Sequence, residues 1–214
     1  MNFVTILALK LLNAYLAIKY RLSFQEVQID VLTVKKEIDS QKPVLFIANH
    51  SSWWDGFFVY EVYKKLKLKK QFKIVMLESE LKKFPFFRLC GAVGLIPKND
   101  QHNKEIFRNL KNHCVCFFPQ GQLTPQNQRP LSFKPGIKQL ITTLHPVQIV
   151  AVGMHIEPFK FMKPTALIRG VFLGDSGHMD TDAENLAAAT EKNLNQVSHH
   201  WTMKIFLSRD KVWK

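Results

Sequence analysis

The sequence predicts a single α/β domain with a mostly parallel or mixed sheet flanked by helices. The chain has 214 residues, of which 46% are hydrophobic, and this is enough for one substantial core. No linker rich in Gly, Ser or Pro divides it, and no repeat or low-complexity segment stands out. Short apolar runs of strand length alternate with helical patterns, as is typical of α/β domains.

Six apolar runs are expected to form buried strands. They are residues 43–49, 72–77, 93–97, 114–119, 147–156 and 166–173. Helical patterns lie near residues 53–66, 101–112, 135–145 and 182–199. Sites in such sheets collect in the loops beyond the carboxyl ends of strands, where Asn49, His50 and residues 119–121 are expected to lie.

The N-terminal segment MNFVTILALKLLNAYLAIKY predicts an amphipathic helix. One face of this helix would carry Leu7, Leu11, Tyr15 and Ile18. Lys10 and Asn13 interrupt the apolar residues, so the uninterrupted runs are too short to cross a hydrocarbon layer of about 30 Å. The segment lacks the basic start and the small-residue cleavage site of a secretory signal, so such a signal is not expected. Two interpretations remain open, a helix packed on the domain and a helix in the membrane interface, with Lys10 and Lys19 reaching the head groups.

The formal net charge of +13 predicts an anionic partner. This partner could be nucleic acid, a phospholipid surface, or a substrate or carrier that bears phosphate. Residues 64–73 contain six lysines, which form either a solvated helix end or an electrostatic docking site for anionic lipid or carrier phosphates. No zinc pattern, recognition-helix module or aromatic RNA-binding signature accompanies these lysines, so nucleic acid is not expected.

The cysteines and histidines predict neither a disulfide framework nor a metal site. The chain has three cysteines, Cys90, Cys114 and Cys116, and an odd number does not form a complete set of disulfides. The alternation in CVCFF places Cys114 and Cys116 on one face of a strand. We therefore expect buried thiols in a reducing compartment. The other histidines that we considered share no ligand spacing with a carboxylate cluster. These are His145, His178, His199 and His200.

The stretch IANHSSWWDGFF, residues 47–58, contains the candidate catalytic pair. His50 is expected in the turn after a strand, and Asp55 in the first turn of the next helix. The bend between strand and helix would let the two side chains meet, so that the carboxylate fixes the tautomer and the free ring nitrogen accepts a proton from a hydroxyl. The alternative is structural, because Ser52-x-x-Asp55 is also a helix-capping pattern.

Four blocks in order resemble the glycerolipid and lysophospholipid acyltransferase family. NHSSWWD (49–55) matches its N-H-x4-D block, and ELKKFPFFRLCGAVGLIPKND (80–100) is similar to its second block. FFPQGQLTP (117–125) resembles a variant of the third block, usually F-P-E-G-T-R-S, and is followed by FKPG (133–136). QIVAVGMHI (148–156) is similar to the fourth block. The series covers roughly residues 43–156.

The resemblance implies that His50 is the general base on an acceptor hydroxyl and that Asp55 orients it. The hydroxyl of a lysophospholipid, glycolipid or other lipid would attack an acyl thioester of coenzyme A or acyl carrier protein. Neither a bound metal nor a redox cofactor is implied. The domains would then be a membrane-interface helix, residues 1–21, and an acyltransferase domain, residues 22–214. The alternative function is a catalytically degenerate acyltransferase fold that binds lipid.

The third block departs from the family pattern. Gln120, Gln122 and Leu123 stand where the family has glutamate, threonine and an arginine that typically faces the acceptor phosphate. Leucine cannot pair with phosphate. Either a nearby cation replaces the arginine, with Arg129 restoring activity on lysophosphatidate, or the acceptor is another hydroxylated lipid, which we favour. The candidate substrate-binding residues are Lys98, Gln120, Gly121, Arg129 and Lys134.

The expected location is the cytoplasmic face of a membrane. Residues 1–20 and the lysines of residues 64–73 would hold the chain there as a peripheral protein.

Overall fold

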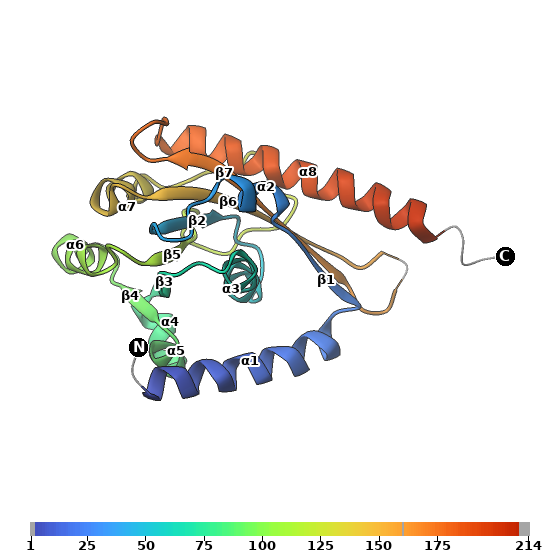
Figure 1. Cartoon of the computed structure of the whole chain (residues 1–214), viewed down its shortest axis with the longest axis horizontal. Coiled ribbons are helices and arrows are strands. Elements are labelled where there is room, and N and C mark those ends of the chain that lie inside the picture. Colours follow the sequence, from blue (N-terminus) through green and yellow to red (C-terminus); the bar gives the residue numbers. More distant parts are fainter. Residues whose placement is uncertain (1–2, 160, 210–214) are drawn as a thin grey trace.

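The computed structural model of the chain describes residues 3–159 and 161–209, with side chains as far as residue 197. Its centre is a seven-stranded mixed sheet with strand order β1-β7-β6-β2-β5-β3-β4 (Figure 1). β6 and β7 are antiparallel, and the other neighbouring pairs are parallel. The strands are β1 (Glu26–Asp30), β2 (Val44–Ala48), β3 (Phe72–Leu77), β4 (Ala92–Leu95), β5 (Cys114–Phe117), β6 (Gln148–Glu157) and β7 (Thr165–Asp175).

Helices cover both faces of the sheet. They are α1 (Phe3–Ser23), α2 (Leu32–Glu37), α3 (Asp55–Leu66), α4 (Glu78–Lys83), α5 (Phe86–Leu89), α6 (Asp100–Asn109), α7 (Gly136–Leu144) and α8 (Ala183–Arg209). Side chains of α2 and α3 pack on one face, and those of α6, α7 and α8 pack on the other. Every residue of β2 is buried for this reason, with Phe46 in the first cluster and Ile47 in the second. A strand covered on both faces is expected to be apolar throughout.

The predicted α/β fold is confirmed, and each of the six predicted strands is present within a few residues. The sequence did not reveal β1, α2, α4 and α5. β1 is an edge strand, EVQID, with no fully buried residue, so it lacks the apolar run that marks the inner strands. α2, α4 and α5 have only four to six residues, too few for a helical period to show.

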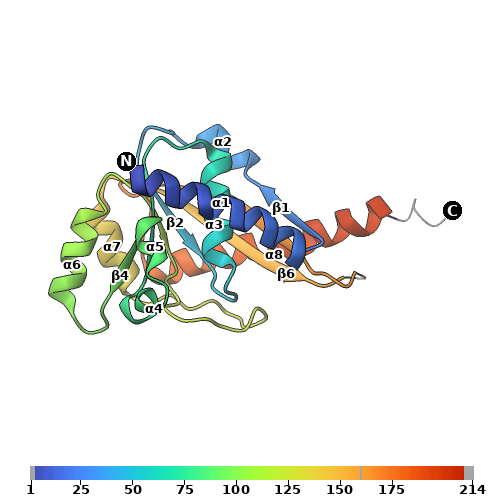
Figure 2. The same cartoon turned by 90° about the horizontal axis from the view of Figure 1, so that it is seen from below.

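The predicted N-terminal helix is α1, which lies across the molecule beside α3 (Figure 2). Leu12 and Leu16 are buried and form a small cluster with Tyr60 of α3. Asn13 donates to the Tyr60 hydroxyl at 3.4 Å and accepts from Lys64 at 2.8 Å. A second set of apolar side chains on α1 is exposed: Phe3, Val4, Ile6, Leu7, Leu11, Tyr15, Ile18 and Leu22. α1 is long and apolar enough to cross a membrane by length and composition, although this alone is weak support for such a role.

The three cysteines are free thiols. Cys114 and Cys116 lie in the same core cluster, as the alternation in CVCFF predicts, and Cys90 is half-buried. Burial raises the pKa of Cys90 to about 11 and that of Cys114 to about 12. Burial, and secondarily the Asp55 carboxylate, raises the pKa of Cys116 well above its ordinary value. All three are therefore neutral thiols at physiological pH.

Candidate active site

The position of His50 is set by the end of β2. β2 ends at Ala48, and the buried Asn49 side chain then continues the pairing with β6. Its amide nitrogen donates to the Met154 carbonyl at 2.9 Å, and its oxygen accepts from the Met154 N–H at 2.8 Å. A side chain that replaces a pair of ladder hydrogen bonds fixes the point at which the backbone leaves the sheet. His50 is the next residue.

The Asp55 carboxylate contacts His50 directly. Asp55 is 1% exposed, and its Oδ2 lies 2.9 Å from His50 Nδ1. The same oxygen accepts the N–H groups of Ser51 at 2.7 Å and Ser52 at 2.8 Å, and Oδ1 accepts the Ser52 hydroxyl at 2.6 Å. The carboxylate therefore orients His50 and also holds the turn that leads into α3, whose N-cap residue, Trp54, makes no side-chain capping hydrogen bond.

The His50 backbone is held on both sides by the loop after β5. The Gln120 Oε1 accepts the His50 N–H at 2.7 Å. The Thr124 N–H and hydroxyl donate to the His50 carbonyl at 2.9 and 3.2 Å, and Gln120 Nε2 donates to the Thr124 hydroxyl at 2.6 Å. The imidazole stacks on Phe118, with ring centroids 4.2 Å apart. With Nδ1 on Asp55, Nε2 has no partner among the described residues.

His50 lines a cavity of about 540 Å³ that is mostly apolar. This size is typical of small-molecule sites. Its polar lining residues are His50, Ser52, Glu80, Gln122 and Lys134, and the backbone of Gly121 also lines it. The remaining wall comes mainly from α1, α3, β3 and the segments that follow them: Leu9, Leu12, Trp53, Phe57, Tyr60, Phe72, Ile74, Val75, Met76, Leu77, Phe87, Leu95, Phe117 and Phe118. The arrangement can therefore hold an apolar chain beside a carboxylate-supported imidazole.

The structure brings some of the predicted substrate-binding residues together. Lys134 and Gly121 line the cavity with His50. Gln120 is buried and directs its amide at the His50 backbone and Thr124 instead of at the cavity. Lys98 and Arg129 lie outside the lining; the Arg129 guanidinium donates to the carbonyls of residues 126 and 128. Of the three predicted cations, Lys134 is therefore the one with access to the cavity.

Sequence reasoning missed Thr124, Phe118 and the two α1 residues of the wall, Leu9 and Leu12. Thr124 and Phe118 belong to the third block, FFPQGQLTP, but a hydrogen bond to His50 and a ring stacked on it leave no spacing signal. Leu9 and Leu12 lie on the face of α1 opposite the one that the sequence emphasised, and nothing in an apolar helix marks which leucines face a cavity.

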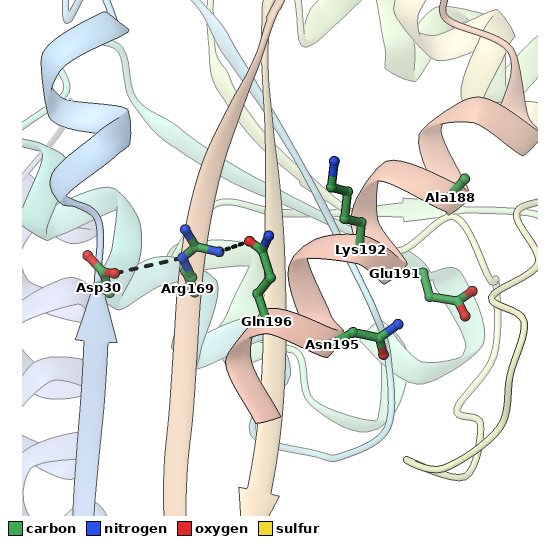
Figure 3. A pocket seen from close by; sticks show the side chains of 7 residues that line it. All are labelled: Asp30, Arg169, Ala188, Glu191, Lys192, Asn195 and Gln196. Atoms are coloured by element: carbon green, nitrogen blue, oxygen red, sulfur yellow. Dashed lines mark hydrogen bonds and ion pairs between the residues drawn. The ribbon is translucent and has the colours of Figure 1, made fainter. Parts of the chain in front are cut away.

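A second cleft lies between β1, β7 and α8 (Figure 3). Its volume is about 900 Å³. Arg169 forms an ion pair with Asp30 at 3.8 Å and donates to Gln196, and Glu191 accepts the N–H of Leu131 at 2.7 Å. The contacts of Arg169 with Asp30 and Gln196 join α8 to β1 and β7.

Other predicted histidines lie apart from the cavity. His145 bonds the Ser176 hydroxyl, and the His178 N–H donates to the Asp175 carbonyl. The side chains of His199 and His200 lie outside the described residues. Within the part of the chain that the structure describes, no group of three or more His, Cys, Asp or Glu side chains is placed to hold a metal ion.

Comparison with known proteins supports the chemistry that this geometry allows. A protein-family model described as Acyltransferase matches residues 31–155, which is more than half of the chain and includes His50, Asp55 and the loop after β5. No curated protein and no solved structure matches the chain. The match of the family model over most of the sheet and the candidate catalytic pair shows that the chain belongs to the Acyltransferase family.

Proposed function

We propose that the protein transfers a fatty acyl group from an acyl thioester of coenzyme A or acyl carrier protein to a hydroxyl of a lipid acceptor. The observation that carries the proposal is the 2.9 Å contact between His50 Nδ1 and the buried Asp55 carboxylate. The imidazole ring of His50 also lines a mostly apolar cavity. A hydroxyl is a weak nucleophile, so a positioned base is the group that this reaction needs.

In this mechanism, His50 Nε2 accepts the hydroxyl proton while the acceptor oxygen attacks the thioester carbonyl carbon. The Asp55 carboxylate stabilises the resulting imidazolium and holds the tautomer in which Nε2 is free. The tetrahedral intermediate collapses, the carbon–sulfur bond breaks, and the imidazolium returns the proton to the leaving thiolate. His50 ends the cycle neutral, and no acyl-enzyme intermediate is needed because the acceptor oxygen is the nucleophile.

The cavity supports a lipid substrate. Most of its wall is formed by aliphatic and aromatic side chains, which fit an acyl chain. Such a wall excludes water, and this favours transfer to the acceptor over hydrolysis of the thioester.

We further propose that the protein is peripheral to the cytoplasmic face of a membrane. The exposed apolar side chains of α1 include Leu7, Leu11 and Ile18, and α1 is also packed on α3 along its other face. A helix fixed to the domain in this way fits the plane of the interface better than a span. The exposed lysines at the end of α3 and in the loop that follows it would add attraction to anionic lipid. The first of them, Lys64, contacts Asn13 of α1.

Acyl transfer by purified protein, with acyl-CoA and acyl carrier protein as donors, tests the proposal. His50→Ala should lower kcat by about 10²- to 10⁴-fold, the usual contribution of a general base. His155→Ala is a matched control, because His155 also contacts a carboxylate, Glu157 at 3.0 Å, but lies outside the cavity lining.

Near wild-type turnover by a folded His50→Ala protein would contradict the mechanism. A wild-type protein that binds lipid and transfers no acyl group would instead support the degenerate, lipid-binding alternative.

A further inference from the structure

We propose that Lys134 binds a single negative charge beside the acceptor hydroxyl, so that the acceptor is a lysolipid with a monoanionic phosphodiester head group. The proposal rests on the proposed acyl transfer and names the acceptor class of that site.

Lys134 reaches the cavity across a glycine. Gly121 has φ +73°, and a Cβ built on it would lie 2.9 Å from Lys134 Nζ and 3.1 Å from its Cδ and Cε. The lysine stem therefore lies directly over the backbone of Gly121, where any other residue would displace it. The Lys134 N–H also donates to the Pro119 carbonyl at 2.9 Å, which fixes the start of the side chain to the same loop. Gly121 follows Gln120, the residue that bonds the His50 N–H, so the ammonium belongs to the loop that holds the candidate base.

The ammonium has no counter-ion. Among the described residues, no carboxylate or carbonyl oxygen pairs with Lys134. By contrast, Arg169 in the cleft beside α8 is paired with Asp30 (Figure 3). Lys138, one turn further along α7, is also paired, with Asp182 at 2.7 Å. An unpaired cation at the edge of an apolar cavity indicates a ligand that carries the opposite charge.

The charge balance of the cavity fits one negative charge better than two. Among the described residues of its lining, Lys134 is the one cation other than a protonated His50, and Glu80 is the one anion. Glu80 already contacts Lys83 at 2.8 Å. A phosphomonoester carries nearly two negative charges at neutral pH, so it would keep an unneutralised charge beside Lys134.

The geometry favours the acceptor over the donor as the source of this charge. In a lysophospholipid, the phosphate is a few bonds from the free hydroxyl, which must reach His50. In coenzyme A or acyl carrier protein, the whole pantetheine arm separates the thioester sulfur from the nearest phosphate. A cation on the loop that holds His50 is therefore better matched to the acceptor phosphate than to a phosphate of the donor.

The test compares three acceptors with one acyl chain and one acyl-CoA donor: lysophosphatidylglycerol, lysophosphatidate and monoacylglycerol. We expect lysophosphatidylglycerol to have the highest kcat/KM. Lys134→Met keeps most of the apolar stem and removes the charge, so its KM for lysophosphatidylglycerol should rise about tenfold. This is the lower end of the energy range for a hydrogen bond to a charged group, and we expect it because Lys134 is exposed to solvent. Its KM for monoacylglycerol should rise much less, because this acceptor has no charge to lose. Lys138→Met is the matched control, with wild-type values for every acceptor.

Several results would overturn the proposal. They are equal use of charged and neutral acceptors, a preference for lysophosphatidate, an equal loss with monoacylglycerol in Lys134→Met, and a KM increase confined to the donor. If the wild-type protein transfers no acyl group to any acceptor, the proposed function fails separately. The role of Lys134 is then tested by ligand binding alone. We would measure how much a non-reactive single-chain alkyl phosphodiester raises the melting temperature, relative to the corresponding alkyl alcohol. If Lys134→Met shows the same rise as the wild type, Lys134 does not bind the phosphodiester charge.

Discussion

Replacing Asp55 by asparagine changes the charge of the candidate pair while keeping its shape. Asp55 Oδ2 accepts two backbone N–H groups and contacts His50 Nδ1, so the asparagine carbonyl oxygen is expected at that position. The amide nitrogen would then face the Ser52 hydroxyl, which can accept from it. Asp55→Asn can therefore keep the hydrogen bonds that support the turn, and the expected loss is the negative charge beside the imidazole.

The size of this loss follows from the contact. Two unit charges about 4 Å apart attract by about 4 kcal/mol at an effective dielectric constant of about 20. His50 Nδ1 and Asp55 Oδ2 are closer, at 2.9 Å, but the imidazole is 25% exposed, and solvent offsets part of the gain. Loss of about 3–4 kcal/mol of stabilisation of the imidazolium corresponds to a fall in kcat of about 10²- to 10³-fold.

Steady-state kinetics with a saturating thioester donor measure this effect. The fall should appear in kcat, because the imidazolium forms only as the proton is transferred, and KM for the acceptor should change little. Ser52→Ala is the informative comparison, since it removes the hydrogen bond to Oδ1 and leaves the carboxylate charged. We expect it to cost less than about tenfold in kcat. A folded Asp55→Asn protein with kcat within tenfold of wild type would refute the catalytic role of the pair.

Two further predictions concern α1 and the thiols. Leu11→Asp should weaken binding to anionic vesicles in a sedimentation assay. Ala17→Asp, also exposed but about 120° away around the helix, should have a smaller effect, and equal losses would argue against an oriented apolar face. Because the pKa of Cys114 is raised to about 12, its neutral form stabilises the fold below pH 9, and this contribution is lost as the pH rises from about 9 toward 12. The difference in denaturation midpoint between wild type and Cys114→Ala should therefore be smaller at pH 10 than at pH 8, and an unchanged difference would show that the thiol does not contribute in this way.

The inner sheet was predictable because its strands are covered on both faces. β2 and β5 contain apolar residues at nearly every position, and such runs stand out from their surroundings. β1 pairs in parallel with β7 at the edge and contains Glu26, Gln28 and Asp30, so no period or apolar run distinguishes it from a loop. A strand that owes its place to a partner distant in sequence leaves little trace in its own residues.

The approach of the candidate pair was predictable from the sequence, but the contacts around it were not. The strand, turn and helix pattern was enough to expect that His50 and Asp55 approach, but their catalytic role stays a prediction. The use of Gln120 was not predictable in the same way. Its similarity to the family glutamate suggested contact with the acceptor, whereas its amide lies between the His50 backbone and Thr124. A glutamine can accept from one and donate to the other, which a carboxylate cannot do.

The double use of α1 determines how membrane binding should be tested. Deletion of residues 1–20 removes the exposed Leu7 and Leu11, but it also removes Leu9 and Leu12, which line the cavity beside His50. A truncated protein that loses activity would therefore say nothing about the membrane, because the wall of the cavity is gone as well. Single substitutions on the exposed face keep that wall intact. If α1 serves both purposes, such variants should retain turnover of acceptor dispersed in detergent and lose it when the same acceptor is embedded in vesicles.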